Sequence, residues 1–331
     1  MTGADRRPAH LPDAGRPPDA DGLRGSRVVV FGGGGFLGGH VRTAFAEAGA
    51  RVTAAGRTEG GPDRLGPFLH AVAPAVVVNA AGAVWGADAR QMRESNAGFP
   101  GRLVAALAAL HHPVRLVHLG SVHEYGPVPN GLALAEDLRP APRGPYGETK
   151  LIGSEAVLRA ARSGAVDGVV LRISNVSGPG SPPQSLLGTI AARLAQAGRA
   201  GQEPVTLRLA PLETHRDFVD ARDVAAAVVA AAWRGGLGGE VLNIGRGEAV
   251  CVRELVARLI ELSGPRTHAV ELVDDTEGRA NGAGRGRAAW QQVDITRAGR
   301  LLAWHPRIPL DRSLSDLLAH HDSRGTTRSM A

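Results

Sequence analysis

The chain contains almost no lysine and very little tyrosine. Its 331 residues include 38 basic ones, yet Lys150 is the only lysine, and Tyr125 and Tyr146 are the only tyrosines. Since arginine supplies every other positive side chain, the one retained lysine is a candidate for a task that arginine cannot perform. An ammonium is a compact charge that can lose its proton, whereas a guanidinium stays charged and binds as a broad fork.

Cysteine and long apolar runs are equally scarce. The single cysteine, Cys251, excludes an internal disulfide and is typical of a reducing compartment. No apolar run reaches the roughly 18 residues that a membrane span requires, and the N-terminus lacks the hydrophobic core of a signal peptide. The sequence therefore predicts a cytoplasmic protein without a membrane partner.

Aromatic residues form only 4% of the chain, and its net charge is +6. The positive charge belongs to arginines scattered among acidic residues, without the basic stripe and stacking aromatics that bind nucleic acid. The sequence accordingly predicts no nucleic-acid partner and no metal site. Residues 1–24, rich in Pro, Asp and Arg, are predicted to be a disordered leader, and residues 320–331 a flexible tail.

Glycine, by contrast, is abundant, and a run of glycines follows the first predicted strand, RVVVF. Gly32, Gly35 and Gly38 form a GxxGxxG pattern that opens an amphipathic helix, with Phe36 and Leu37 in its first turn. Glycines let the backbone turn tightly and approach a pyrophosphate, whose charge a helix N-terminus favours. This placement between strand and helix predicts a dinucleotide-binding loop.

The end of the second predicted strand indicates which dinucleotide binds. A carboxylate at this place binds the adenosine ribose of NAD, whereas an arginine accommodates the 2′-phosphate of NADP. The chain has Arg57 here and no acid before Glu59. The sequence therefore favours NADP, with NAD as the less favoured alternative.

A third buried strand, PAVVVNAAG, ends in small residues. Ala80, Ala81 and Gly82 would let the backbone lie against a cofactor, and Asn79 is placed to tie neighbouring strands together. Asn96 is predicted to begin the helix NAGFPGRLVAALAAL, where it is either a helix N-cap or a cofactor contact.

The remaining motif surrounds the only lysine. Tyr146 and Lys150 stand four residues apart in YGETKLIGSEAVL, a predicted helix with a proline just ahead of its start. Such a pair shares one helix face, and a nearby ammonium lowers the pKa of a phenol from its reference of about 10. Tyr146 is therefore a candidate proton donor and acceptor. Ser121 ends the apolar run VRLVHLGS, a predicted parallel strand, and active sites of open α/β sheets lie at such strand ends.

With these motifs the sequence resembles the extended short-chain dehydrogenase/reductase family, also described as the NAD-dependent epimerase/dehydratase family, in its nucleotide-sugar branch. The resemblance covers roughly Arg27 to Leu318 and rests on GGGGFLG, NAAG, GSVHEYG, YGETK, LRISNVSGPG and RDFVDARDV. The YGETKLIGSEAVL helix is most similar to that of dTDP-4-keto-6-deoxyhexose 4-ketoreductases.

The resemblance implies a division of roles. Ser121 would polarise the substrate oxygen, Tyr146 would exchange the proton, and Lys150 would bind the nicotinamide ribose while lowering the tyrosine pKa. Further residues are expected to contact the sugar nucleotide: His123, Asn175, Arg216 and Arg285, with Arg287 as an alternative to Arg285. A homodimer through helices at Gly98–Leu110 and Tyr146–Ala161 is typical of the family.

Members of the family differ in chemistry, and the residues after the serine distinguish them. Nucleotide-sugar 4,6-dehydratases place an Asp-Glu pair there, whereas this chain has Val122 and His123, which argues against dehydration. Epimerases usually retain NAD tightly and often have a longer second-strand connection than the 22 residues from Arg57 to Asn79. A reductase is therefore favoured over a 4-epimerase with tightly bound NAD.

The predicted function is NADPH-dependent reduction of the 4-keto group of a nucleotide-linked, dTDP-type, deoxysugar in deoxysugar or antibiotic biosynthesis. A non-catalytic NADP-binding regulator is disfavoured, since such proteins commonly lose the tyrosine or the lysine. The predicted fold is α/β, a doubly wound parallel Rossmann sheet over residues 25–175 to which 218–244 returns. A smaller C-terminal lobe, 176–217 with 245–319, is expected to bind the sugar nucleotide.

Overall fold

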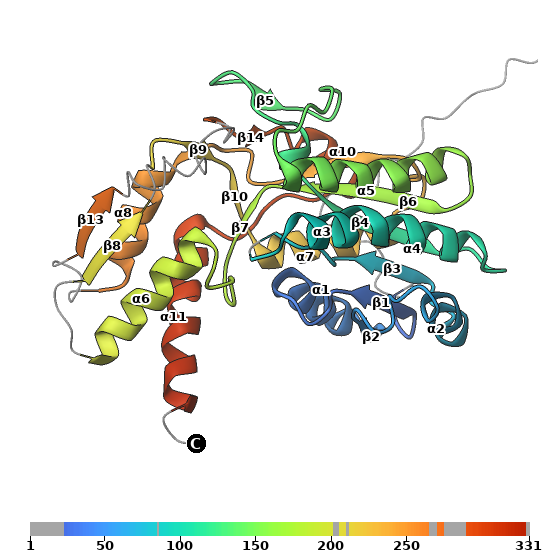
Figure 1. Cartoon of the computed structure of the whole chain (residues 1–331), viewed down its shortest axis with the longest axis horizontal. Coiled ribbons are helices and arrows are strands. Elements are labelled where there is room, and N and C mark those ends of the chain that lie inside the picture. Colours follow the sequence, from blue (N-terminus) through green and yellow to red (C-terminus); the bar gives the residue numbers. More distant parts are fainter. Residues whose placement is uncertain are drawn as a thin grey trace, which may run out of the picture.

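Six parallel strands form the central sheet of the larger lobe in the part of the chain that the structure describes. Their spatial order is β2 (Arg51–Ala55), β1 (Arg27–Phe31), β3 (Val76–Asn79), β4 (Arg115–Ser121), β6 (Asp167–Ile173) and β11 (Val241–Ile244). The computed structural model describes residues 23–84, 86–200, 205–209, 212–264, 270–274 and 289–328 (Figure 1). The strand order reverses between β1 and β3, which opens a crevice at their carboxyl ends. The doubly wound sheet predicted from the sequence is confirmed.

The strands are apolar on both faces because both faces are covered. In β1, Val28 and Val30 point into one hydrophobic core, while Val29 and Phe31 point into another. All four side chains are almost fully buried. A parallel strand buried on both sides appears in the sequence as a continuous apolar run, as RVVVF does.

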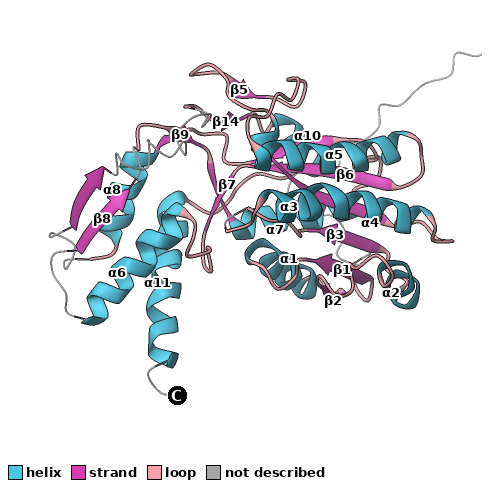
Figure 2. Cartoon of the chain, viewed as in Figure 1, coloured by secondary structure: helices cyan, strands magenta, loops and turns pink. Residues whose placement is uncertain are grey.

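Helices form a layer on each face of the sheet (Figure 2). The core around Val28 receives α1 (Phe36–Glu47), α7 (Ala221–Trp233) and α10 (Thr296–Leu302). The opposite core receives α2 (Leu65–Val72), α4 (Phe99–Ala108) and α5 (Pro145–Arg162). The sequence had assigned residues 245–319 to the second lobe. The structure differs, because Ala298, Leu302 and Trp304 bury their side chains against the central sheet.

The smaller lobe is built from helices beside a two-stranded parallel sheet (Figure 1). The helices are α6 (Leu186–Ala200), α8 (Val252–Leu262) and α11 (Leu310–Arg328), and the strands are β8 (Val205–Leu209) and β13 (Val270–Asp274). Leu314 and Leu317 of α11 are fully buried in this lobe. Helix α11 continues to Arg328, past residue 320, where the sequence predicted the start of a flexible tail.

Short strand pairs lie between the two lobes and beside the sheet. They are β7 (Asn175–Ser177) with β10 (Phe218–Asp220), β9 (His215–Arg216) with β12 (Val250–Cys251), and β5 (Ala133–Leu134) with β14 (Gln292–Val293). None of the described helices is both long and apolar enough to cross a membrane.

The helix expected to begin at Asn96 begins earlier. It starts with α3 (Ala89–Arg93), whose N-cap Asp88 forms a capping box with Gln91. It passes through a π-helical turn, Glu94–Gly98, before continuing as α4. Asn96 lies inside this turn and is not an N-cap. Single π-helical turns within α-helices are frequent at functional sites.

Candidate active site

The glycine-rich loop joins β1 to α1 at the crevice of the sheet. Gly32 has a φ of 78°, and a β-carbon there would lie 2.8 Å from backbone atoms of Ala80 and Ala81. A β-carbon at Gly38 would lie 2.0 Å from the carbonyl oxygen of Gly32. Gly35 is the N-cap of α1 and provides no side-chain cap, so the first turn can offer its N–H groups to an anion. The loop therefore fits a dinucleotide pyrophosphate.

The first turn of α1 is also tied to the segment that leads into the second lobe. Phe36 packs edge-on against the ring of His40, with centroids 5.5 Å apart. The Nε2 of His40 hydrogen-bonds the carbonyl oxygen of Pro179 at 2.8 Å. Leu37 packs against the core of the sheet lobe. The glycine loop is thereby held between the sheet and the chain that leads to α6.

Arg57 lies exposed just after the end of β2. Two residues further on, the Glu59 carboxylate accepts a hydrogen bond from the Gly56 N–H at 2.8 Å. This bond, together with a second backbone hydrogen bond, lowers the pKa of Glu59. A cavity of about 390 Å³ adjoins this turn and is lined by Thr58, Glu59, Asp63, Arg64, Pro67 and Phe68. The strand end therefore carries both an arginine and a carboxylate.

The turn after β3 is fixed by two asparagines. The Asn79 Oδ1 accepts from the Ala81 N–H at 3.2 Å, so its Nδ2 donates to Nδ1 of the buried His118 on β4 at 3.0 Å. Asn79 thus ties neighbouring strands, as the sequence predicted. Asn96 bonds both backbone groups of Ala83 and, through Nδ2, Thr149 Oγ1 of α5. The backbone of residues 80–82 is therefore fixed by Asn79 on one side and by Asn96 on the other.

Ser121, Tyr146 and Lys150 come together at the carboxyl end of β4. The Ser121 hydroxyl hydrogen-bonds the Tyr146 phenol. Lys150, one helical turn along α5, donates to the carbonyl oxygen of Leu119 in β4. Gly147 lets α5 approach this closely, because a β-carbon there would lie 2.5 Å from the carbonyl oxygen of His123.

Burial shapes the acid–base properties of this group. Burial raises the pKa of Tyr146, a hydrogen bond to Ser121 opposes the rise, and the Glu124 carboxylate adds to it. This differs from the expectation that Lys150 lowers the phenol pKa. Burial also lowers the pKa of Lys150 to about 8, against the opposing charge of Glu124. The phenol is thus held protonated at neutral pH.

The residues that follow Ser121 form a short 3₁₀ turn, Val122–Glu124. Val122 is buried, and His123 is exposed with its ring edge-on to Tyr146 at 5.6 Å. His123 therefore lies beside the phenol. Glu124 is in the interior, and its side chain is fully buried.

The predicted substrate residues occupy the junction between the lobes. Asn175 donates through Nδ2 to the carbonyl oxygen of Asp217 at 2.9 Å and to Gln291 Oε1 at 3.2 Å. Arg216 is largely buried and donates to the carbonyl oxygen of His215. The predicted positions Arg285 and Arg287 lie outside the described residues.

Sequence reasoning missed Asp217, which organises this junction. Its buried carboxylate accepts from Ser174 Oγ and from the N–H groups of Arg246, Gly247 and Val293. Burial raises its pKa, and these bonds act in the opposite direction. The available signal was its place in the motif RDFVDARDV.

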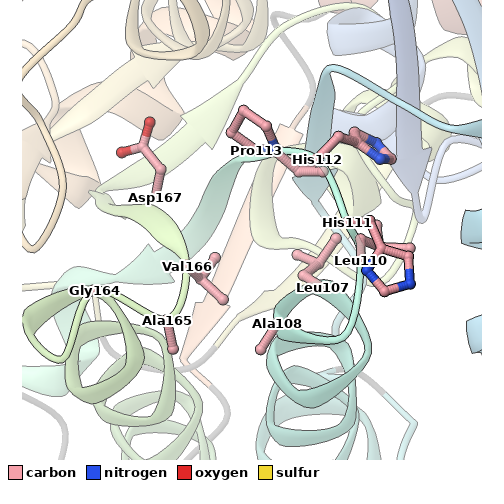
Figure 3. A pocket seen from close by; sticks show the side chains of 11 residues that line it. Leu107, Ala108, Leu110, His111, His112, Pro113, Gly164, Ala165, Val166 and Asp167 are labelled. Atoms are coloured by element: carbon pink, nitrogen blue, oxygen red, sulfur yellow. The ribbon is translucent and has the colours of Figure 1, made fainter.

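A separate cavity of about 390 Å³ lies at the amino ends of β4 and β6, between the last turns of α4 and α5 (Figure 3). His111 and His112 line it together with apolar residues such as Leu107 and Val166. Ser121 lies at the carboxyl end of β4, which is the opposite end of the parallel strands. This cavity is therefore not part of the candidate active site.

Known proteins resemble this chain in sequence and in fold. The family model described as "NAD dependent epimerase/dehydratase family" matches residues 28–245. The chain is 40% identical over 309 residues to dTDP-6-deoxy-L-talose 4-dehydrogenase (NAD(P)(+)) from Kitasatospora kifunensis, covering 88% of this chain and 94% of that protein. It is 27% identical to GDP-6-deoxy-D-mannose reductase from Pseudomonas aeruginosa, covering 90% and 98% of the two chains.

Solved structures agree with the sequence matches. The structure of RMD from Pseudomonas aeruginosa complexed with NADPH superimposes with a TM-score of 0.77 and 25% identity, covering 91% of this chain and 98% of the other. MoeE5 in complex with UDP-glucuronic acid and NAD gives a TM-score of 0.75 and 27% identity, covering 92% and 99%. The chain therefore belongs to the NAD-dependent epimerase/dehydratase family of extended short-chain dehydrogenases/reductases, in its nucleotide-sugar branch.

Proposed function

We propose that this protein reduces the 4-keto group of a nucleotide-linked deoxysugar, with NADPH as the reductant and dTDP as the nucleotide. One observation carries the proposal: Ser121, Tyr146 and Lys150 converge at the carboxyl end of β4, while a buried valine follows the serine. Val122 has no proton to exchange, so elimination of water lacks its acid. The relatives named as a 4-dehydrogenase and a reductase of deoxysugars support the same chemistry.

The residues of the site suit the reductive direction. NADPH, when bound, supplies the hydride. The Ser121 hydroxyl would hydrogen-bond the keto oxygen, and Tyr146 would donate the proton that converts it to a hydroxyl group. Because burial raises the pKa of Tyr146, the phenol holds this proton at neutral pH. Lys150, on the same face of α5 as Tyr146, would hold the nicotinamide ribose.

Binding of the substrate and cofactor would use the remaining predicted residues. We assign the pyrophosphate of NADPH to the Gly32–Gly38 loop and its 2′-phosphate to Arg57. We assign the sugar nucleotide to the junction around Asn175 and Arg216, with His123 beside Tyr146. A homodimer through α4 and α5, a cytoplasmic location and a role in antibiotic biosynthesis remain predictions.

The first test is an assay of NADPH oxidation with dTDP-4-keto-6-deoxyglucose as the probe, with NADH in parallel and product analysis by NMR. We expect NADPH to be consumed in step with formation of the 4-hydroxy sugar, and Arg57→Ala to weaken NADPH use more than NADH use. In a parallel assay with the 4-hydroxy sugar dTDP-6-deoxyglucose and no NADPH, formation of its C4 epimer would instead identify a 4-epimerase.

Tyr146→Phe tests the proposed proton donor. We expect at least about a 100-fold loss of kcat, because general acid catalysis typically contributes that much. NADPH binding, followed by fluorescence quenching of the tryptophans, should stay close to that of the wild type. Wild-type turnover in this variant would remove Tyr146 from the mechanism.

A further inference from the structure

Glu124 lies behind the three candidate catalytic residues, and the proposed chemistry does not use it. Its Oε1 accepts hydrogen bonds from the Ser121 N–H and from the Ser154 hydroxyl, both at 2.8 Å. A β-carbon at Gly120 would lie 2.6 Å from the same oxygen. The carboxylate is therefore closely enclosed, with no exposed surface.

These contacts join the two elements that carry the catalytic groups. Ser121 ends β4, whereas Ser154 lies on α5, one turn beyond Lys150. One carboxylate oxygen thus fixes the backbone of the serine and, through Ser154, the helix that carries the tyrosine and the lysine. A displacement of either element would break one of these two bonds.

The second carboxylate oxygen anchors the group to the sheet. Glu124 Oε2 accepts from Arg172 Nε on β6 at 2.8 Å, and the two side chains are only 0% and 4% exposed. The guanidinium lies 4.4 Å from the ring centroid of Tyr125, whose hydroxyl donates to Asn243 on β11. The ion pair is therefore held in place by neighbouring strands.

The charge of Glu124 reaches both titrating groups of the site. It raises the pKa of Tyr146 and opposes the burial that lowers the pKa of Lys150. The other titratable groups facing this pair are His123, beside the phenol, and the buried His118, near Lys150. Beyond the carboxylate lies Arg172.

We propose that Glu124 is a positioning residue: it fixes Ser121 against the helix of Tyr146 and Lys150, and it supplies the fixed negative charge behind them. The inference deepens the proposed function and rests on it for the identity of the proton donor. A merely structural ion pair would stabilise the fold without changing how Tyr146 titrates.

Ser154→Ala tests the positional part. It removes the hydroxyl that links α5 to Glu124 and leaves the charge in place. We expect kcat to fall about tenfold with KM for NADPH unchanged, since a 1 Å misplacement of catalytic groups can cost about 100-fold and a smaller one costs less. The exposed Glu155, the next residue on the helix, provides the matched control Glu155→Gln, which should keep wild-type kcat.

The double variant Glu124→Gln/Arg172→Met tests the charge. Removing both partners of a buried ion pair avoids leaving one charge unpaired, so the variant should fold and keep its Tm within a few degrees. We expect the tyrosinate of Tyr146 to form at lower pH, because the charge that raises its pKa is gone. The guanidinium of Arg172 lowers the pKa of the second tyrosine, Tyr125. Its loss should therefore raise the pKa of Tyr125, opposite to the change at Tyr146.

Ultraviolet titration of tyrosinate is decisive because the chain has only two tyrosines. Tyr146→Phe in each background identifies which tyrosine gives each signal. The titration needs no substrate, so it tests the inference even if the reductase assay fails. An unchanged Tyr146 titration in the folded double variant would overturn the role of the charge. If that variant does not fold, wild-type kcat in Ser154→Ala overturns the proposal, and the tenfold loss supports it.

Discussion

Lys150 stands out both in the composition, as the only lysine, and in the structure, as a buried charged side chain. Its ammonium is buried near the carboxyl end of β4, and its pKa of about 8 is far below that of a solvated lysine. Arginine could not replace it, because a guanidinium is larger and does not lose its proton. Burying this charge is expected to cost stability for the sake of the site, as is common for functional residues.

Lys150→Met should make the protein inactive and more stable at neutral pH. The folded pKa is lower than the unfolded one, so between about pH 8 and pH 10.5 the unfolded chain binds a proton that the folded chain has lost. Wild-type stability therefore rises with pH across this window, and below it the cost of the buried charge is fully present. The gain from Lys150→Met is on the order of 2 kcal/mol at pH 7, after allowing for the lost bond to Leu119.

Guanidinium unfolding at pH 7 and at pH 10 measures this effect. The difference between Lys150→Met and wild type should shrink toward the higher pH. Arg159→Met, which removes an exposed charge from the same helix, is the control and should show no such trend. A constant difference at both pH values would contradict the lowered pKa.

At the scale of elements, close backbone approach decides where the site forms. The glycine loop touches the turn after β3 at Gly32, and α5 approaches the π-helical turn at Gly153, where a β-carbon would lie 2.1 Å from the carbonyl oxygen of Asn96. These contacts bring the ends of β1, β3 and β4 to one crevice. Side chains of ordinary size would keep these elements apart and prevent the candidate catalytic groups from meeting.

Two adjacent glycines of α1 allow a matched comparison. Gly38→Ala would place a methyl group against the Gly32 carbonyl, so we expect a loss of about 1–3 kcal/mol in stability and a large loss of NADPH affinity. Gly39→Ala meets nothing within 4 Å and should stabilise the helix by about 0.5–1 kcal/mol. Thermal unfolding and NADPH titration of both variants test the difference. Equal behaviour of the two would refute the role of close packing in the loop.

At the scale of the whole molecule, the lobes are joined by an ion-pair cluster centred on Arg222 of α7. Arg222 pairs with Asp220, the N-cap of its own helix, and with Asp316 on α11 of the smaller lobe at 2.7 Å. Asp220 also lies in β10, which pairs with β7. The sheet lobe and the helix of the second lobe therefore share one charged contact.

Asp316→Asn should loosen α11 without unfolding the protein. The pair is partly exposed, so we expect at most about 1 kcal/mol in global stability. Amide hydrogen exchange should accelerate in α11 and remain unchanged in the central sheet. Glu254→Gln, at an exposed carboxylate on α8 of the same lobe, is the control. Acceleration throughout the chain, or none in α11, would contradict a local role of the Arg222–Asp316 ion pair.

Local patterns explain what the sequence could predict. The glycine loop, the buried strands and the Tyr146–Lys150 pair each depend on residues a few positions apart. Glu124 and Arg172 stand 48 residues apart, and Asp217 binds Arg246 and Gly247 across 29 and 30 residues. No periodic pattern links such partners, so the interior polar networks emerged only in the fold.

The helix at the end of the chain was not predicted for a different reason. Helix α11 is largely polar, and its sequence HHDSRGTTR looks like a tail when taken alone. Leu314 and Leu317 anchor the helix in the smaller lobe, and the helix then extends past them. Tertiary packing of a few apolar side chains therefore decided a boundary that local composition could not.

The solitary lysine has a practical consequence. If isotopically labelled lysine were supplied during expression, the whole label would reside in one residue, Lys150, within the candidate active site. The side-chain resonance would then be a single line, free of the overlap that obscures such signals in ordinary proteins. Each ligand added, and each step in pH, could be followed from that one atom without modifying the protein.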